Sequence, residues 1–360
     1  MTTIGIICEY NPFHNGHLHQ FQVLREKLGE DTAILCLMSG NFTQRGEPAI
    51  FAKEDRAKAA VLCGADLVLE LPVTCALSSA EGFAAGGVTI LSKIGIKRLS
   101  FGTESGDKAS LMKTAEFLLS SELDASILRH LKTGCSYGAA RQLAAEEFGV
   151  GALLKNSNDI LAVEYCKAIL KYKLDIEIIP ITRPGGYLEE TPDPAAPSAL
   201  SLRLALQQGH PWENCVPSGA AEVFRSADRY SIEAGERAIL ARLRSLTEEE
   251  YAALPYGSEG LWRKLMQAGK TGATLEEVIL MTKSKRYARS RIQRMLICAY
   301  LGLTAKDLER QPTYVRTLAF SHRGRVLLRE LRQGMFPVID AGETPPDPDY
   351  AALERTCSDL

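Results

Sequence analysis

The first 28 residues of this chain constrain its fold more than any other segment. An apolar run over residues 4–8 is short enough to be a buried strand, and Asn11-Pro12 then interrupts it. Residues 18–28 carry apolar side chains at helical spacing, which predicts an amphipathic helix. His14 and His17 therefore lie where a strand ends and a helix begins. In an open α/β sheet, ligands bind beside this edge.

The residue types at this junction suit an anionic ligand. The first N–H groups of a helix have no partner within the helix, and they favour an anion. Gly16 has no Cβ, so a phosphate or a base can approach the backbone closely. His14 and His17 can donate hydrogen bonds to phosphate oxygens. The pair predicts nucleotidyl transfer, in which an acid attacks the α-phosphate of a nucleotide and pyrophosphate leaves.

Other interpretations of the two histidines remain open at this point. They could bind a metal ion, but two histidines three residues apart without a neighbouring carboxylate or Cys form a weak ligand set. They could also be ordinary polar residues at a helix start. The glycine and lysine spacing of a Walker-type phosphate loop is absent from this segment.

Strands and helices alternate up to about residue 208, which predicts an α/β fold with a doubly wound, Rossmann-like parallel sheet. Further strands are expected at residues 32–38, 66–71, 98–101 and 177–181. Polar or glycine-containing loops follow several of these strands, and their residues are candidates for the same ligand pocket or for plain solvated turns. The candidates are Ser39, Asn41, Gln44, Arg45, Gly102 and Arg183. Asn158 either caps the next helix or faces the ligand, and the start of the helix at residues 198–203 offers a second anion site.

The composition changes after His210, where no alternating strands are apparent. We expect a nucleotidyltransferase-like domain over residues 1–208 and a mainly α-helical, basic domain over residues 209–360. Residues 261–331 hold 15 Lys and Arg against 5 Asp and Glu. This surplus predicts binding of RNA phosphates, and a solvated helix face is the competing interpretation. The candidate RNA-binding residues are Lys283, Lys285, Arg286, Arg289, Arg291 and Arg294.

The remaining composition places few limits on function. The tail after Phe336 is rich in Pro and acidic residues and is expected to be poorly ordered. Nine cysteines without CxxC spacing favour reduced thiols and a cytoplasmic location. No apolar segment is long enough to span a bilayer, and no basic, apolar leader precedes the first strand. The sequence leaves the oligomeric state open, and a homo-oligomer is compatible with it.

Taken together, these motifs resemble the HIGH-type nucleotidyltransferase superfamily and, within it, the bacterial tRNA(Met) cytidine acetate ligases. The resemblance covers nearly the whole chain. It rests on GIICEYNPFHNGH at residues 5–17, SGNFTQRGEP at 39–48, DLVLELP at 66–72, FGTE at 101–104, NDILAVEY at 158–165 and KRY at 285–287. One departure concerns the second signature of the superfamily, where Leu200 replaces a hydroxyl residue and Ser201 is the nearest substitute.

The resemblance implies an ATP-dependent reaction in two steps. Acetate attacks the α-phosphate of ATP to give acetyl-adenylate and pyrophosphate, and the exocyclic amine of the wobble cytidine of elongator tRNA(Met) then takes the acetyl group. His14 and His17 are the implied catalytic residues, and Mg²⁺ is expected to accompany ATP. The implied ATP-binding residues are Ile7, Cys8, Glu9, Tyr10, Asn11, Pro12, Phe13, His14, Asn15, Gly16, His17, Leu18, His19, Gln20, Gly102, Asn158 and Arg183.

Two rival functions remain open at the level of the sequence. The first is a small-molecule adenylyltransferase or cytidylyltransferase, which would share the histidine loop but would need no basic helical domain. The second is a non-catalytic RNA-binding protein that keeps ATP as a structural ligand.

Overall fold

A computed structural model describes residues 2–104, 107–182, 193–194 and 197–358 of the chain. Its strands are β1 (Thr3–Cys8), β2 (Ala33–Ser39), β3 (Leu67–Leu71), β4 (Arg98–Thr103), β5 (Glu177–Thr182), β6 (Val315–Phe320) and β7 (Val338–Ile339). The helices of the first half are α1 (Asn15–Leu28), α2 (Lys53–Leu62), α3 (Val73–Ala76), α4 (Ala80–Lys93), α5 (Lys108–Phe117), α6 (Ser121–Leu131), α7 (Tyr137–Glu147) and α8 (Ser157–Lys171). Those of the second half are α9 (Ala199–Gln208), α10 (Ser218–Ser226), α11 (Glu236–Ser245), α12 (Glu248–Ala253), α13 (Leu261–Thr271), α14 (Leu275–Thr282), α15 (Arg289–Leu301), α16 (Ala305–Glu309), α17 (His322–Leu331) and α18 (Pro348–Ser358).

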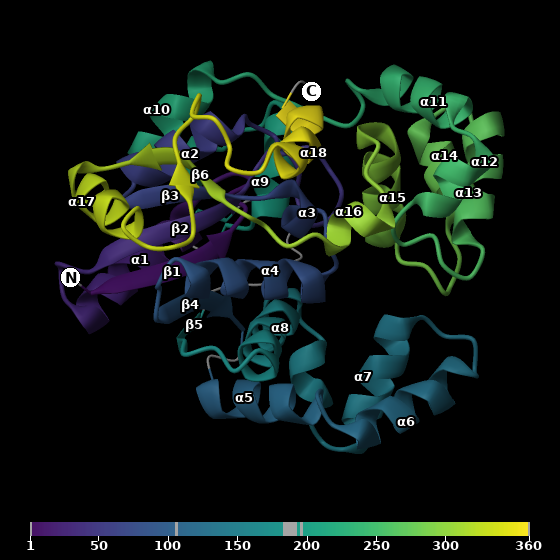
Figure 1. Cartoon of the computed structure of the whole chain (residues 1–360), viewed down its shortest axis with the longest axis horizontal. Coiled ribbons are helices and arrows are strands. Elements are labelled where there is room, and N and C mark those ends of the chain that lie inside the picture. The colour runs from purple at the N-terminus through teal and green to yellow at the C-terminus, as the bar shows by residue number, and fades with distance from the viewer. Residues whose placement is uncertain (1, 105–106, 183–192, 195–196, 359–360) are drawn as a thin grey trace.

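The strands form a single sheet in the order β5-β4-β1-β2-β3-β6-β7 (Figure 1). Neighbouring strands from β5 to β3 are parallel, so their carboxyl ends meet at one edge. This confirms the predicted doubly wound parallel sheet, and each of its five predicted strands overlaps an observed one.

Two apolar cores lie on opposite faces of this sheet because side chains along a strand alternate between its faces. In β2, Leu35 and Leu37 belong to the core that α4, α5, α8 and α17 cover. Ile34 and Cys36 belong to the other core, under α1, α2, α9 and α10. Both faces are covered, which explains why the parallel strands are apolar throughout rather than alternating with polar residues.

Helices α11 to α15 form a separate bundle beside the sheet (Figure 1). Leu243, Leu265 and Leu296 are buried in its own apolar core. Phe42 and Leu77, which come from loops of the sheet region, complete that core, and the Tyr256 hydroxyl donates a hydrogen bond to the Leu77 carbonyl at 2.7 Å. The bundle is therefore fixed against the carboxyl edge of the sheet.

Two expectations about the second half of the chain were wrong. Strands do occur after residue 210, because β6 pairs antiparallel with β3 and β7 extends the sheet from β6. The tail after Phe336 is not poorly ordered where it is described: it contains β7 and α18, and Tyr350 of α18 is fully buried. The Tyr350 hydroxyl lies 2.7 Å from the hydroxyl of Thr74. Composition failed here because burial of Tyr350 and Ala351 outweighs the surrounding Pro and acidic residues.

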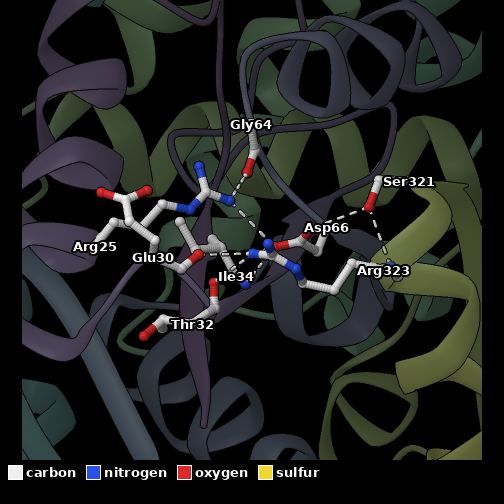
Figure 2. A network of polar contacts seen from close by, with 9 residues as sticks. Arg25, Glu30, Thr32, Ile34, Gly64, Asp66, Ser321 and Arg323 are labelled. Carbon is white, nitrogen blue, oxygen red and sulfur yellow. Dashed lines mark hydrogen bonds and ion pairs between the residues drawn. The ribbon is translucent and has the colours of Figure 1, made fainter. Parts of the chain in front are cut away.

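A buried carboxylate attaches β6 and α17 to the end of the sheet opposite the carboxyl edge (Figure 2). Asp66 accepts hydrogen bonds from the Ile34 N–H at 3.0 Å and from the Ser321 hydroxyl at 2.9 Å. The guanidinium of Arg25 lies 3.3 Å from the same carboxylate, and that of Arg323 lies 3.8 Å from it. Residues far apart in sequence therefore share one charged group.

The start of α17 also approaches the sheet too closely for a larger residue. A Cβ at Gly324 would lie 1.6 Å from the carbonyl oxygen of Asp66. Glycine at this position is thus required by the contact. Among the described residues, no helix has the length and apolar character that crossing a bilayer requires.

Candidate functional site

The histidine loop after β1 has a specific local structure. His14 is the N-cap of α1, with an extended backbone, and its Nδ1 accepts a hydrogen bond from the Gly16 N–H at 3.1 Å. The His14 N–H donates in return to Nδ1 of His17 at 3.2 Å. The two side chains thereby form a reciprocal capping box. Their rings stack with centroids 3.8 Å apart.

These two hydrogen bonds define which imidazole nitrogens can serve a ligand. In both rings Nδ1 is the acceptor for a backbone N–H. The proton of each neutral imidazole then lies on Nε2, which makes both Nε2 atoms hydrogen-bond donors. Both rings lie at the amino end of a 14-residue helix, and this end is electropositive and favours an anion. His14 is fully buried, so its protein partners fix its orientation.

The buried guanidinium of Arg56 holds the histidine loop in place through hydrogen bonds to backbone carbonyls. Nη1 donates to the carbonyl of Glu9 at 2.6 Å and to that of Ser39 at 3.1 Å, and Nε donates to the carbonyl of Phe51 at 3.0 Å. Nη2 donates to the carbonyl of Gly40. Arg56 has no exposed surface, and its burial lowers its pKa to about 10, against the opposing field of the Glu9 carboxylate. It remains charged near neutral pH and joins the ends of β1 and β2 to α2.

Glu9 connects the histidine loop to the loop after β2. Its carboxylate accepts a hydrogen bond from the Gln44 N–H at 2.6 Å. Burial raises the pKa of the Glu9 carboxyl, and the Gln44 N–H and the charges of Arg203 and Arg56 oppose that shift. The predicted proximity of Gln44 to the histidine loop is thus observed. Asn41, from the same loop, lines other cavities.

A small cavity of about 120 Å³ opens beside the histidine loop, between the carboxyl ends of β1 and β4. Seven of the predicted ATP-binding residues line it together with Ile6, Phe101, Leu161 and Tyr165. The seven are Ile7, Cys8, Tyr10, His17, Gln20, Gly102 and Asn158. Segments separated by more than 100 residues therefore meet here. The Asn158 amide is oriented by the Glu104 carboxylate, to which it donates at 2.8 Å.

Tyr165 is a candidate that the residue-by-residue sequence analysis missed. Only 2% of the side chain is exposed, and its hydroxyl has no hydrogen-bond partner among the described residues. Burial raises the pKa of Tyr165 well above its ordinary value, so the hydroxyl is neutral. Its place in the NDILAVEY segment, two turns of α8 after Asn158, was the only signal in the sequence.

The other predicted ATP-site residues mostly build the loop rather than line the cavity. The Asn11 side chain accepts from the Ile50 N–H at 2.7 Å, and Phe13 is fully buried against aromatic neighbours. Asn15 donates to the carbonyls of Pro194 and Asn214 at 3.2 and 3.0 Å. His19 is exposed on α1. Pro12, Gly16 and Leu18 complete the turn and the first turns of the helix, and Arg183 lies outside the described residues.

At the start of α9, the second predicted anion site, the serine hydroxyls and the Ser201 N–H already form helix-capping hydrogen bonds. The Ser198 hydroxyl accepts from the Ser201 N–H at 3.0 Å, and the Ser201 hydroxyl donates to the Ser198 carbonyl at 2.9 Å. Arg203 donates to the carbonyl of Asn11 at 2.8 Å. The start of α9 therefore supports the histidine loop, and Ser201 acts in the cap.

The basic segment before and within α15 divides into two sets. Arg289 forms an ion pair with Glu276, and Arg291 donates to the Tyr256 carbonyl at 2.7 Å. Arg294 is buried and donates to the Gln44 carbonyl at 3.0 Å. Lys283, Lys285 and Arg286 are exposed, as Arg289 is, but none of the three forms an ion pair with a described residue.

Arg294 also brings the helical bundle into contact with the site. Its carbonyl partner Gln44 is the residue whose N–H binds Glu9. A Cβ at Gly46, which has φ of 78°, would lie 2.3 Å from the Arg294 backbone nitrogen. The bundle therefore packs directly on the loop after β2. Among the described residues, no group of three His, Cys, Asp or Glu side chains could hold a metal ion.

The paired histidines and the cavity at the carboxyl edge of a doubly wound sheet are the arrangement that the sequence predicted for a nucleotidyltransferase. In agreement, residues 1–349 match the family model described as HIGH Nucleotidyl Transferase. A tRNA(Met) cytidine acetate ligase from Acetivibrio thermocellus is 36% identical, with 92% of this chain and 86% of that protein covered. The ligase of the same name from Thermosipho melanesiensis is 35% identical, with coverages of 94% and 84%.

Two solved structures are also similar to this chain. The apo structure of Thermotoga maritima TmcAL has a TM-score of 0.90 and 28% identity, and the match covers 100% of this chain and 93% of that one. A second TmcAL structure from that organism, bound with alpha-thio ATP, has a TM-score of 0.85 and 31% identity, with coverages of 94% and 85%. The chain belongs to the tRNA(Met) cytidine acetate ligase family of HIGH nucleotidyl transferases.

The position of Arg56 generates a prediction about stability. Replacing it in Arg56→Met leaves the carbonyls of Glu9, Ser39, Gly40 and Phe51 without their donor, and the free energy of unfolding is expected to fall by about 4 kcal/mol. Chemical denaturation measures this change. Arg129→Met is the matched control, because its ion pair with Glu147 is exposed and should contribute less than about 1 kcal/mol. Equal stability of the two variants would contradict the role given to Arg56.

Proposed function

We propose that this protein is an ATP-dependent ligase that activates acetate as acetyl-adenylate. It then acetylates the exocyclic amine of the wobble cytidine of elongator tRNA(Met). The observation that carries the proposal is the stacked pair of His14 and His17 at the amino end of α1, with His17 lining the same cavity as Gly102 and Asn158. The names of the relatives, and the ATP analogue in one neighbour's structure, support the same reaction.

The first step needs electrostatic stabilisation more than acid–base chemistry. An acetate oxygen attacks the α-phosphorus, the bond to the bridging oxygen breaks, and pyrophosphate leaves with the electron pair. Charge increases on the phosphate oxygens in the transition state, where preorganised donors are most effective. His14 and His17, held by the capping box, provide those donors at the amino end of α1.

Activation of acetate explains why a nucleotide is required. A carboxylate is a poor acyl donor, whereas its mixed anhydride with AMP has a good leaving group. The exocyclic amine of cytidine is a weak nucleophile because its lone pair is delocalised into the ring. The base has to leave the anticodon stack to reach the acetyl group.

We assign the nucleotide to the cavity beside β1 and β4, with Gly102, Asn158 and Tyr165 around the base or ribose. Arg183 remains a predicted phosphate ligand. Mg²⁺ remains an expectation: the described residues provide no ligand cluster for it, so the ion would be held mainly by the triphosphate and water. A cytoplasmic location and a homo-oligomeric state also remain predictions.

For the tRNA, we assign the exposed basic residues Lys283, Lys285 and Arg286 to phosphate contacts. Lys285 and Arg286 border an open hollow of about 380 Å³, together with Lys264 and Tyr287. Arg289, Arg291 and Arg294, from the same predicted set, would support this surface through their protein contacts. A small-molecule nucleotidyltransferase would need no such surface.

The first experiment measures pyrophosphate release with ATP and acetate, followed by mass analysis of tRNA(Met) nucleosides after tRNA is added. Acetate-dependent pyrophosphate and an acetylated cytidine are expected. His17→Ala should lower both rates by about 10²–10³-fold, as loss of an oxyanion-type donor does, while His322→Ala on α17 should not. Release of pyrophosphate without an acetylated tRNA product would favour a small molecule as the acceptor. Full activity of His17→Ala would favour a structural role for ATP.

The unpartnered hydroxyl of Tyr165 leads to a second prediction. Tyr165→Phe should raise the KM for ATP about five-fold, because a neutral hydrogen bond contributes about 1 kcal/mol. The nucleotide-free variant should be at least as stable as the wild type, since a buried polar group without a partner has been removed. Tyr172→Phe, at a side chain 48% exposed, is the control. An unchanged KM for ATP would exclude this contact.

The basic surface leads to a third prediction. Replacing both residues in Lys285→Ala/Arg286→Ala should weaken tRNA binding and reduce the slope of log Kd against log salt by about 1 per lost phosphate contact. Acetate-dependent pyrophosphate release should be unchanged. The matched double variant Lys27→Ala/Arg329→Ala removes two exposed charges from α1 and α17, outside the helical bundle. If both double variants bind tRNA alike, the assigned surface is wrong.

A further inference from the structure

A second cavity, of about 250 Å³ and with several charged residues in its lining, lies at the same edge of the sheet but beyond β2 and β3. Gly40, Asn41 and Phe42 line it from the loop after β2. Lys53 at the start of α2 and Glu70 of β3 line a second side. Arg316 of β6, the loop at residues 341–342 and Glu354 of α18 form a third side, and Val73 and Ala76 of α3 add apolar surface. The cavity therefore depends on the tail that composition suggested would be poorly ordered.

The charges around this cavity form two pairs. Lys53 Nζ lies 2.8 and 3.0 Å from the two carboxylate oxygens of Glu70. Arg316 Nε lies 3.3 Å from the Glu354 carboxylate, which also accepts a hydrogen bond from the Tyr314 hydroxyl. Burial raises the pKa of Glu354, and the nearby Glu70 carboxylate adds to that shift. The cavity thus presents carboxylate acceptors beside cationic donors.

Direct contacts link this cavity to the histidine loop. Arg56 binds the carbonyls of both Glu9 and Gly40. The Glu70 carboxylate lies directly against Gly40, where an added Cβ would be 2.4 Å from Oε1. Adjacent strands lie about 4.8 Å apart, so β3 lies about 10 Å from β1 across the sheet. The cavity therefore lies next to the proposed nucleotide site, along the same carboxyl edge of the sheet.

We propose that this cavity binds the acceptor cytosine and that Glu70 accepts a hydrogen bond from its exocyclic amine and takes the amine proton. The inference rests on the proposed function and names a site for its second substrate. A cytosine edge presents an amine donor beside two ring acceptors. A carboxylate is the complementary partner for the amine, and Lys53 and Arg316 supply donors for the acceptors.

The transfer step balances with these groups. The amine nitrogen attacks the carbonyl carbon of acetyl-adenylate, and a C–N bond forms. The proton on that nitrogen passes to the Glu70 carboxylate, which acts as the general base. The bond between the carbonyl carbon and the phosphate oxygen breaks, and AMP leaves with its electron pair. No other reactant is required.

An adjoining groove supports an RNA base rather than acetate as the occupant. This groove, of about 500 Å³, shares Asn41, Phe42 and Lys53 with the second cavity. It continues along the helical bundle to Tyr230 and Tyr300, and Tyr230 is 43% exposed. Aromatic side chains of this kind stack nucleobases of single-stranded RNA.

The test compares Glu70→Gln with the wild type in two separate assays. Acetate-dependent exchange of pyrophosphate into ATP reports the first step and should change less than two-fold. Single-turnover transfer from preformed acetyl-adenylate to tRNA should fall by about 10² or more, as removal of a general base does. Glu26→Gln, at an exposed carboxylate on α1, is the control and should affect neither assay.

The ion pair with Lys53 requires its own control. Lys53→Gln breaks the same pair but keeps the carboxylate, so a merely structural role predicts equal loss of transfer in Lys53→Gln and Glu70→Gln. The inference predicts a much larger loss for Glu70→Gln. If that variant fails to fold, Lys53→Gln/Glu70→Gln restores a neutral amide pair, and it should exchange pyrophosphate but not transfer.

Each result bears on the inference. Normal transfer by Glu70→Gln would overturn it, and loss of exchange in parallel with transfer would indicate that the cavity serves acetate or ATP. If the wild-type protein forms no acetylcytidine, both the proposed function and this inference are wrong. If both the wild type and Glu70→Gln transfer the acetyl group, only the inference about Glu70 is wrong.

Discussion

The site depends on one buried cation. Arg56 donates to four backbone carbonyls that belong to the end of β1, the end of β2 and the segment before α2. A planar guanidinium can reach several acceptors at once, which an ammonium group cannot do in the same geometry. The positions of Glu9, and through it of the histidine loop, follow from this interaction. The same guanidinium fixes Gly40 beside Glu70, so both cavities at the carboxyl edge share one anchor.

The two ends of the sheet have different roles. Asp66 and its arginine partners join the strand starts to β6 and α17 with ion pairs and hydrogen bonds. This end of the sheet therefore stabilises the fold. At the carboxyl end, polar groups instead surround cavities, and Tyr165 has a hydroxyl that no described residue satisfies. A ligand in that cavity would provide the hydrogen-bond partner that the Tyr165 hydroxyl lacks among the described residues. The helical bundle adds Arg294 to this edge and thereby connects the surface proposed for tRNA to the loop after β2.

Much of the catalytic half was predictable from local patterns. The β1 run, the break at Asn11-Pro12 and the periodicity of α1 located His14 and His17 at a strand-to-helix junction, and the structure confirms that placement. Gly102 and Asn158 were predicted as separate candidates, and the structure brings them into one cavity with His17. The basic run was harder to interpret. Charge density alone could not separate exposed Lys285 from Arg294, which is buried under the loop after β2.

The sequence by itself determined the parallel strands, their order of alternation with helices and the chemistry of the histidine loop, because these depend on local periodicity and capping. Only the tertiary structure decided that β6 returns to the sheet, that α18 covers Thr74, and that Glu70, Arg316 and Glu354 face one cavity. The hydroxyls of Thr74 and Tyr350, for example, belong to residues 276 positions apart in the chain. No local pattern encodes such contacts, since they form only when burial of Tyr350 and pairing of β6 with β3 offset the entropy of closing the long connections.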